Sequence, residues 1–229
     1  MFPIYIYNEG VELPDEGSYY VIAGNGNFLH KDTGIVRCFV SVKEVSFLAD
    51  IDPTNWVSLT IPKIPAEIVQ KIKQFFKEVV LKYGTEANST LYYNKITEKF
   101  KIHISEQIVS HGAVHYNRRL IDDELLEYKD FLRIGTIHSH CDFGAFHSGT
   151  DIKDEKDFDG LHVTFGNNDK EEITITASVV VNGCRTEIPP ENVLCGIKLF
   201  DDKSYYLENQ IDYDISSWMA KIHPESFVS

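Results

Sequence analysis

The sequence of 229 residues predicts a mixed β-sheet protein of the α+β or α/β class. One long amphipathic segment, at residues 64–84, carries its apolar side chains on a single helical stripe. Many short runs rich in β-branched and aromatic residues precede and follow this segment, which is the pattern of strands. With 43% hydrophobic and 25% charged residues, the chain can bury a core. A helix followed by many strands indicates a protein built on a mixed sheet.

Residues 1–62 are predicted to form a small β-rich region. Their strand-like runs are IYIY, SYYVIAG and IVRCFVSV, separated by the turn-forming stretches GNGN and KDTG. Glycine and asparagine supply the backbone conformations that tight turns need, so we expect short strands joined by turns.

Residues 63–200 are predicted to form the main domain, beginning with the long helix. Gly84 follows the last apolar residue and is expected to end the helix. The helical stripe consists of Ile68, Ile72, Phe75, Phe76, Val79 and Val80. Strands are expected at 89–94, 99–107, 112–117, 133–140, 161–166 and 172–183, with a short helix or loop at 122–132. Residues 201–229 form an acidic, tyrosine-rich tail, which either docks a partner or packs on its own domain.

Charge and composition exclude several classes of partner. The net charge is −13, and the sequence has no cluster of lysine and arginine. Phosphate-rich nucleic acids and anionic membranes would be repelled, so neither is an expected partner. The start, MFPIYIYNEG, lacks a secretory signal, and no apolar run approaches membrane-spanning length. The scattered cysteines form no CxxC pair, which indicates reduced thiols in a cytoplasmic protein.

The stretch TIHSHCDFGAFHSGTDIKDEKD, at residues 136–157, indicates a metal site. Residues two apart on a strand point to the same face, so His138 and His140 aim two imidazoles at one point. Asp151 follows a glycine-containing turn, and SGTD resembles the start of a helix that could bring the carboxylate back to the strand end. Catalytic zinc takes three protein ligands and leaves one place for water. We therefore predict one catalytic Zn²⁺ per chain, held by His138, His140 and Asp151.

The spacing H-x-H-x7-S-x2-D arises by chance in about 10⁻³ of chains of this size. A lone histidine would more often be an ordinary core or surface residue. The four-residue pattern favours a metal site.

This spacing resembles the signature of the JAMM (JAB/MPN-type) zinc metalloproteases, a family that includes deubiquitinating enzymes. The likeness extends over residues 64–182. The stretches AGNGNFLHKD, IHSHCDFGAFHSGTD, DEKDFDGLHVTFG and VVVNG are similar to a bacterial branch typified by PRTRC system protein A. The resemblance implies an MPN/JAB-type, cytidine-deaminase-like sheet flanked by helices, with residues 1–62 as a β-rich extension of the same protein type.

The resemblance also assigns roles to two further residues. Glu86 matches the family's upstream glutamate and would hydrogen-bond the zinc-bound water, while Ser148 would help to hold the oxyanion. A carboxylate in reach can move the water's proton to the departing amine, and a hydroxyl donor can stabilise the developing charge. Glu78, Glu98 and Glu106 are nearby alternatives to Glu86, most simply interpreted as surface charges.

Two positions depart from the family pattern. Cys141 and His147 stand where the family usually has proline. Cys141 adjoins a predicted ligand, but as the strand neighbour of His140 it should point to the opposite face. His147 is expected on the wall of the substrate groove. Whether either residue contributes to the site is open.

Three functions are consistent with these residues. The first is a JAMM-type (iso)peptidase acting at the C-terminus of a bacterial ubiquitin-like protein, by deconjugation or precursor processing. By the resemblance, activating and conjugating enzymes encoded in the same operon are further partners. The second is a non-catalytic MPN scaffold, and the third is the same hydrolysis on another peptide. The metal-hydrolase hypothesis rests on residue chemistry and resemblance together, while the substrate class rests on resemblance alone.

Overall fold

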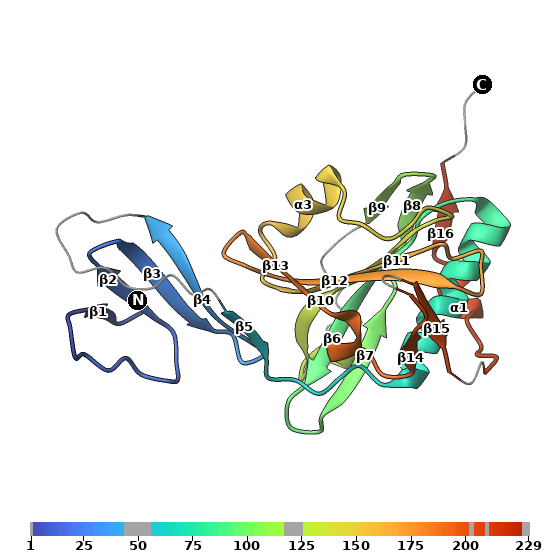
Figure 1. Cartoon of the computed structure of the whole chain (residues 1–229). Coiled ribbons are helices and arrows are strands. Elements are labelled where there is room, and N and C mark those ends of the chain that lie inside the picture. The colour runs from blue at the N-terminus through green and yellow to red at the C-terminus, as the bar shows by residue number, and fades with distance from the viewer. Residues whose placement is uncertain (1, 44–55, 117–125, 202–203, 209–210, 226–229) are drawn as a thin grey trace. The chain divides into compact units, whose positions relative to one another are not determined.

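A computed structural model describes residues 2–43, 56–116, 126–201, 204–208 and 211–225. The chain divides into two compact units, Met1–Pro62 and Lys63–Ser229 (Figure 1). Residues 122–125 of the stretch 122–132, for which the sequence suggests a short helix or loop, lie outside the described part, and residues 126–128 are helical. Each unit is built around a β-sheet.

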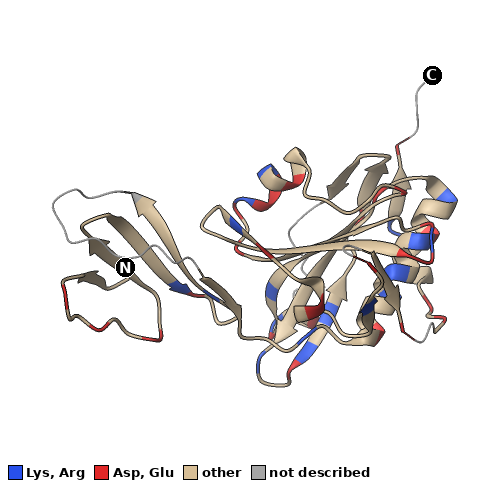
Figure 2. Ribbon diagram, viewed as in Figure 1, with Lys and Arg blue, Asp and Glu red and all other residues tan. Residues whose placement is uncertain are grey.

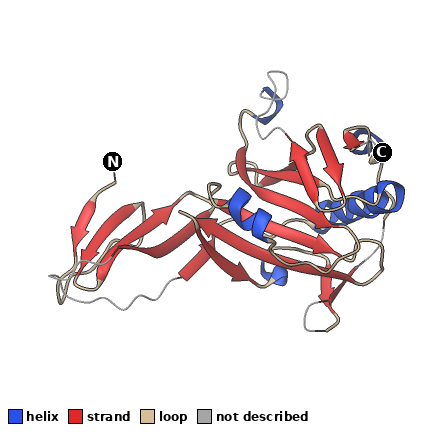
Figure 3. Cartoon of the chain, turned by 90° about the horizontal axis from the view of Figure 1, so that it is seen from above, coloured by secondary structure: helices blue, strands red, loops and turns tan. Residues whose placement is uncertain are grey.

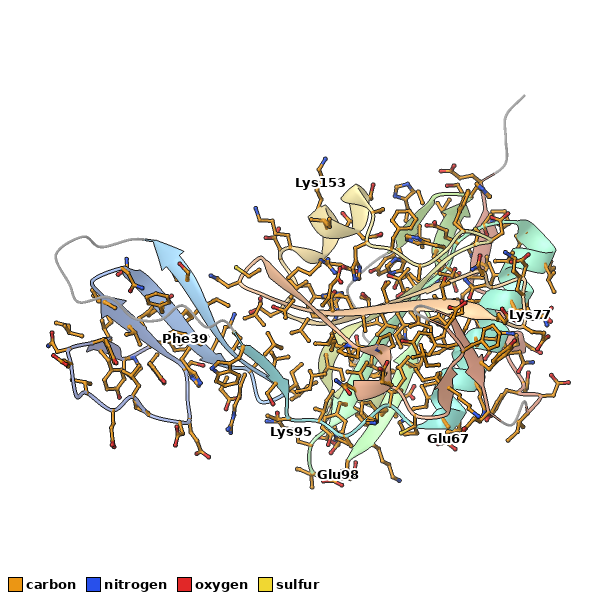
Figure 4. The ribbon with its side chains drawn as sticks, in the orientation of Figure 1. Phe39, Glu67, Lys77, Lys95, Glu98 and Lys153 are labelled. Carbon is orange, nitrogen blue, oxygen red and sulfur yellow. The ribbon has the colours of Figure 1, made fainter. Side chains whose placement is uncertain are left out.

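The first unit contains one sheet whose described strands follow chain order from β1 to β5. β1 pairs with β2 in parallel, and the other neighbours are antiparallel. The rings of Phe28 and Phe39 stack 5.1 Å apart in its core. Phe39 is labelled in Figure 4. The strands are β1 (Ile4–Ile6), β2 (Tyr19–Ala23), β3 (Gly26–Asp32), β4 (Val36–Lys43) and β5 (Trp56–Leu59).

The second unit is organised around a mixed sheet with the order β14-β15-β12-β11-β10-β6-β7, with β13 paired to β12. A smaller sheet has the order β16-β8-β9. The central strands are β6 (Asn88–Asn94), β7 (Lys99–His103), β10 (Leu132–His140), β11 (Gly160–Gly166) and β12 (Ile173–Val181). The shorter strands are β8 (Gln107–Ser110), β9 (Ala113–Tyr116), β13 (Cys184–Ile188), β14 (Ile197–Leu199), β15 (Ser204–Leu207) and β16 (Ile222–Pro224).

Helices are few in the described part of the second unit (Figure 3). They are α1 (Ala66–Tyr83), α3 (Gly149–Glu155), the 3₁₀ turn η1 (Pro190–Asn192) and α4 (Ser216–Met219). No helix among the described residues has both the length and the apolar character needed to cross a membrane. Basic and acidic residues are mixed along the ribbons of α1 and α3 (Figure 2).

The predicted fold class is wrong. The sequence and its family resemblance predict an MPN/JAB-type sheet flanked by helices, but 44% of the described residues lie in strands and only 18% in helices. The chain is therefore a β-rich protein with a curled mixed sheet. The physical reason is that many segments between the long strands form further short strands, so that α1 is the one long helix in the described part.

The helix α1 forms as its apolar stripe predicts. Ile72, Phe75, Phe76 and Val79 are buried. Gly84 adopts a left-handed conformation with φ of 65°, and its N–H donates to the carbonyl of Val80 at 2.8 Å. Glycine bears this conformation without steric cost, which is why the helix ends there.

The tail after residue 200 packs on the second unit where it is described. β15 pairs with β12, and β16 pairs with β8. The ring of Trp218 meets that of Phe75 edge-on, with centroids 5.6 Å apart. These apolar aromatic groups bury surface against α1, which stabilises the association of the tail with the sheet and the helix.

Candidate metal centre

The strands β10 and β11 each have one apolar and one polar face. Phe165, on the apolar face of β11, meets Phe76 of α1 at a centroid distance of 5.9 Å. Phe165 pairs with Ser139 of β10, so the neighbouring residues His138 and His140 point to the other face of the sheet. Both histidines are buried. Because side chains alternate along a strand, the sequence IHSH places both imidazoles on the face away from α1.

β10 and β11 are parallel, and this register brings a second row of polar groups beside the histidines. His138 lies opposite Thr164, and their Nε2 and Oγ1 atoms are 3.3 Å apart. Thr136 lies opposite His162, with Oγ1 and Nδ1 at 2.8 Å. The polar side chains of the two strands therefore contact one another in pairs across this face.

The chain turns sharply after His140, over a glycine on the neighbouring strand. A Cβ atom at Gly166 would lie 2.2 Å from the backbone nitrogen of Ala145, so only glycine allows this close approach. Cys141 has φ of 41°. A proline, which the family usually has here, fixes φ near −65° and could not adopt this turn. The turn is held by backbone hydrogen bonds, including Asn168 N–H to the Cys141 carbonyl at 2.9 Å.

The turn leads into α3, whose first residues form a capping box. The Asp151 N–H donates to Ser148 Oγ at 3.1 Å, and the Ser148 N–H donates to Asp151 Oδ2 at 2.8 Å. These two bonds satisfy backbone donors that a helix start leaves free. They also fix the direction in which the Asp151 carboxylate points.

His138, His140 and Asp151 come together and could hold a metal ion. The Nε2 atoms of the two histidines are 3.3 Å apart. Asp151 Oδ1 lies 3.4 Å from Nε2 of His138, and Oδ2 lies 3.2 Å from Nε2 of His140. Two ligands about 2.0–2.1 Å from a tetrahedral zinc are about 3.3 Å apart. The two imidazole nitrogens have this spacing, and the Asp151 carboxylate lies close enough to both for the three groups to hold one ion.

Burial and charge act strongly on this cluster. Burial alone would raise the pKa of the Asp151 carboxyl, but its hydrogen bonds to His138 and His140 hold that pKa well below its usual range. Burial alone would lower the pKa of the His138 imidazole, but the hydrogen bond and charge of Asp151, together with the charges of Glu155 and Glu86, raise it. An ionised carboxylate beside two imidazoles is a group of ligands that can bind a divalent cation.

A cavity of about 270 Å³ opens at the cluster and contains the other predicted site residues. Glu86 lines it, just before β6, and so does Ser148. Burial raises the pKa of the Glu86 carboxyl, against the opposing influence of His140 and His138. All five predicted site residues thus line one cavity. Its other walls include residues 112–116, Phe143, Phe146 and Glu155.

Cys141 and His147 do not line this cavity. The Cys141 thiol is buried and lies 3.5 Å from the carbonyl oxygen of His111. Burial, with the charges of Glu86 and Asp142, raises its pKa to about 12, so the thiol stays protonated. The His147 ring lies against Arg185, with Nδ1 3.1 Å from Nη1, rather than on the groove wall. Burial and this guanidinium lower the pKa of His147 to about 4.

The sequence did not reveal a charged cluster behind the three candidate ligands. Glu155 lies on α3, with Oε1 3.9 Å from Nδ1 of His138 and 3.4 Å from Nδ1 of His162. Arg185 reaches it from β13 and forms an ion pair with Oε2. The acidic stretch KDEKD looks like a solvated loop, and the one available signal was the helical spacing of four residues between Asp151 and Glu155.

No protein-family profile matches the chain, and no curated protein does. Among solved structures, the chain is similar to the solution structure of protein DSY2949 from Desulfitobacterium hafniense, a structural genomics target. The two share 12% sequence identity with a TM-score of 0.33, over 52% of this chain and 86% of that one.

Proposed function

We propose that this chain is a zinc-dependent peptidase of the JAMM type. The reaction is hydrolysis of an amide bond at the C-terminus of a bacterial ubiquitin-like protein, by deconjugation or by precursor processing. The observation that carries the proposal is the convergence of His138, His140 and Asp151, with ligand atoms 3.2–3.4 Å apart in a cavity. The β-rich fold is not used as support, because the same chemistry occurs on unrelated folds and the proposal depends on the site alone.

The donor set fits zinc. Two neutral imidazoles and one carboxylate occur as the ligands of known catalytic zinc sites, and a zinc ion held by these three groups would have a fourth place for water or substrate. Among the described residues, no cysteine joins the cluster. A zinc ion bound there would make water more acidic and polarise the carbonyl group of the substrate.

Glu86 is the proposed general base. Its carboxylate lines the same cavity as the three ligands, and its pKa is raised by burial. A carboxylate with a raised pKa takes a proton from the attacking water more readily and can then pass it to the nitrogen of the departing amine. Water and amide thus yield a carboxylic acid and an amine, without a covalent enzyme intermediate.

Ser148 is the proposed oxyanion donor. Its oxygen accepts the Asp151 N–H as the helix cap. Its hydroxyl also hydrogen-bonds the Asp151 carboxylate, and in the proposed role it turns from that carboxylate to the substrate carbonyl oxygen. A donor aimed at the carbonyl oxygen stabilises the negative charge that develops there during attack.

The substrate proposal rests on the family resemblance and is supported by the walls of the cavity. Residues 112–116, which include β9, line one side, and among the described strands β9 pairs only with β8. An extended peptide tail could add to this edge by backbone hydrogen bonds. Phe143 and Phe146 also line the cavity, and both are about half exposed. They offer apolar surface to the tail.

The cytoplasm is the proposed location. All four cysteines are free thiols, two of them buried and none paired. Free thiols persist in a reducing compartment such as the cytoplasm.

Cleavage of a fusion tests this function. Full-length zinc-loaded protein is incubated with a ubiquitin-like protein joined through its C-terminus to a reporter, by a peptide or an isopeptide bond. We expect release of the reporter by the wild type and a rate at least about 10²-fold lower for Glu86→Gln. The Glu86→Gln protein should keep its zinc, because Glu86 is not a ligand.

Glu78→Gln is the matched control, since Glu78 is an exposed glutamate on α1. It should cleave as the wild type does. A wild type that binds zinc but releases no reporter from either fusion would contradict the enzyme assignment and favour a binding module. Loss of zinc in Glu86→Gln would contradict the role of Glu86.

A further inference from the structure

The ring of His138 is contacted on both of its nitrogens. Nε2 faces the cluster with His140 and Asp151, while Nδ1 faces Oε1 of Glu155 at 3.9 Å. This distance lies within ion-pair range and is longer than a direct hydrogen bond, so a small shift of either side chain would complete the contact. Glu155 is only 6% exposed.

We propose that Glu155 is the positioning residue for the metal ligand His138. This inference rests on the proposed zinc site and assigns a new residue to it. A histidine that binds a metal through Nε2 must carry its proton on Nδ1, and a carboxylate facing Nδ1 favours that tautomer and fixes the ring orientation. Glu155 provides the carboxylate from α3, the helix that also carries Asp151.

Arg185 holds Glu155 in place from another strand. Its guanidinium donates to Glu155 Oε2 and to the hydroxyl of Ser178, which is fully buried on β12. The paired charges of Glu155 and Arg185 offset the cost of burying a carboxylate. Because Oε2 is engaged by Arg185, Oε1 is the oxygen that faces the two histidines.

His162 completes the surroundings of Oε1. Its Nε2 lies 3.0 Å from the carbonyl oxygen of Phe158, which can only accept, so Nε2 carries a proton. Its Nδ1 lies 2.8 Å from Thr136 Oγ1 and 3.4 Å from Glu155 Oε1. With the ring proton on Nε2, Nδ1 accepts from the Thr136 hydroxyl. His162 then packs beside Oε1 without donating to it, and the Glu155 carboxylate is held through Oε2 by Arg185.

The alternative is a purely structural ion pair that ties α3 to β13. Such a pair would affect the stability of the metal-free protein and leave metal affinity unchanged. An orienting carboxylate affects affinity and the geometry around the metal. The two roles therefore differ in a readout that does not depend on catalysis.

The test is zinc affinity of the full-length protein, measured by competition with a chromophoric chelator. We expect Glu155→Gln to bind zinc about 10–100-fold more weakly than the wild type. Glutamine keeps the shape of the side chain and removes its charge. With Co²⁺ in place of zinc, the visible absorption bands should shift in Glu155→Gln, because the ligand field changes when His138 reorients.

Asp157→Asn is the matched control. Asp157 is an exposed carboxylate two residues further along, and its removal should leave both affinity and spectrum as in the wild type. A second variant, Arg185→Gln, keeps the Glu155 carboxylate but frees it to move. It should weaken zinc binding by a smaller factor than Glu155→Gln does. If Glu155→Gln does not fold, the zinc affinity of Arg185→Gln tests the inference in its place.

The outcomes separate this inference from the proposed function. If the wild type binds zinc tightly and both Glu155→Gln and Arg185→Gln bind it equally well, the role of Glu155 is wrong and the zinc site stands. If Glu155→Gln lowers only the melting temperature of the metal-free protein, the ion pair is structural and the inference is overturned. If the wild type binds no zinc, the proposed function itself fails.

Discussion

At the scale of single residues, Ser148 and Asp151 each serve two purposes. They cap α3 by reciprocal hydrogen bonds, and both face the cavity. The pattern S-x-x-D would be explained by the cap alone, because this spacing satisfies the first backbone donors of a helix. The cap does not explain the two imidazoles, whose Nε2 atoms lie 3.3 Å apart against the same carboxylate.

Substitutions of Ser148 separate its two roles. Ser148→Ala removes the cap and the hydroxyl, and we expect a loss of about 1 kcal/mol in the free energy of unfolding. Ser148→Gly is expected to cost only a few tenths of a kcal/mol, since glycine is a tolerated cap. Both variants should turn over the fusion about 10²–10³-fold more slowly, because both lack the donor. Chemical denaturation and turnover measured together check this, and a fully active Ser148→Gly would refute the oxyanion role.

Residues close in sequence were the predictable part of the site. His138 and His140 lie two apart on a strand, and this spacing was enough to predict that their rings converge. Glu155 and Arg185 could not be predicted, because their contact depends on how α3 and β13 meet in space. The wrong expectation for His147 has the same cause, since its partner is Arg185 on a distant strand.

At the scale of elements, the site is built at the junction of β10 and α3. The parallel pair β10 and β11 requires a crossover connection, and α3 lies within it (Figure 1). The turn after His140 passes directly over Gly166. Its position determines where α3 begins, and so where Asp151 lies relative to the two histidines.

Substitution of Gly166 should therefore disturb both packing and metal binding. In Gly166→Ala the added methyl group would meet backbone atoms of residues 143–145, at 2.2–2.4 Å, so the turn must move. We expect a loss of about 1–3 kcal/mol in stability, as for other overpacked sites, together with weaker zinc binding. Gly149→Ala is the control, because nothing lies within 4 Å of its added methyl group. Equal stability and zinc affinity in these two variants would contradict the role given to the turn.

Long elements could be predicted and short ones could not. The stripe and terminal glycine of α1 predicted the helix and its end, and both are confirmed. Strands such as β14 and β16 have three residues each. Three residues cannot show an alternating pattern, so their pairing with the sheets depends on tertiary contacts alone.

At the scale of the whole molecule, the wrong fold class follows from those short strands. A family motif predicted the arrangement of a few polar residues, and the helices expected around them came from the resemblance rather than from helical patterns in this sequence. The described chain uses strand pairing instead, in both units. All five predicted site residues belong to the unit Lys63–Ser229.

Metal analysis tests the central claim most directly. Proteins purified in the presence of zinc and then desalted are measured by atomic emission: the full chain, the fragment Lys63–Ser229, His138→Ala and His223→Ala. His223 is an exposed histidine paired with Glu106, and its removal controls for nonspecific binding. We predict one zinc ion per chain in the full chain, the fragment and His223→Ala, and none in His138→Ala. A wild type without zinc, or a His138→Ala protein that keeps the full amount, would contradict the metal site.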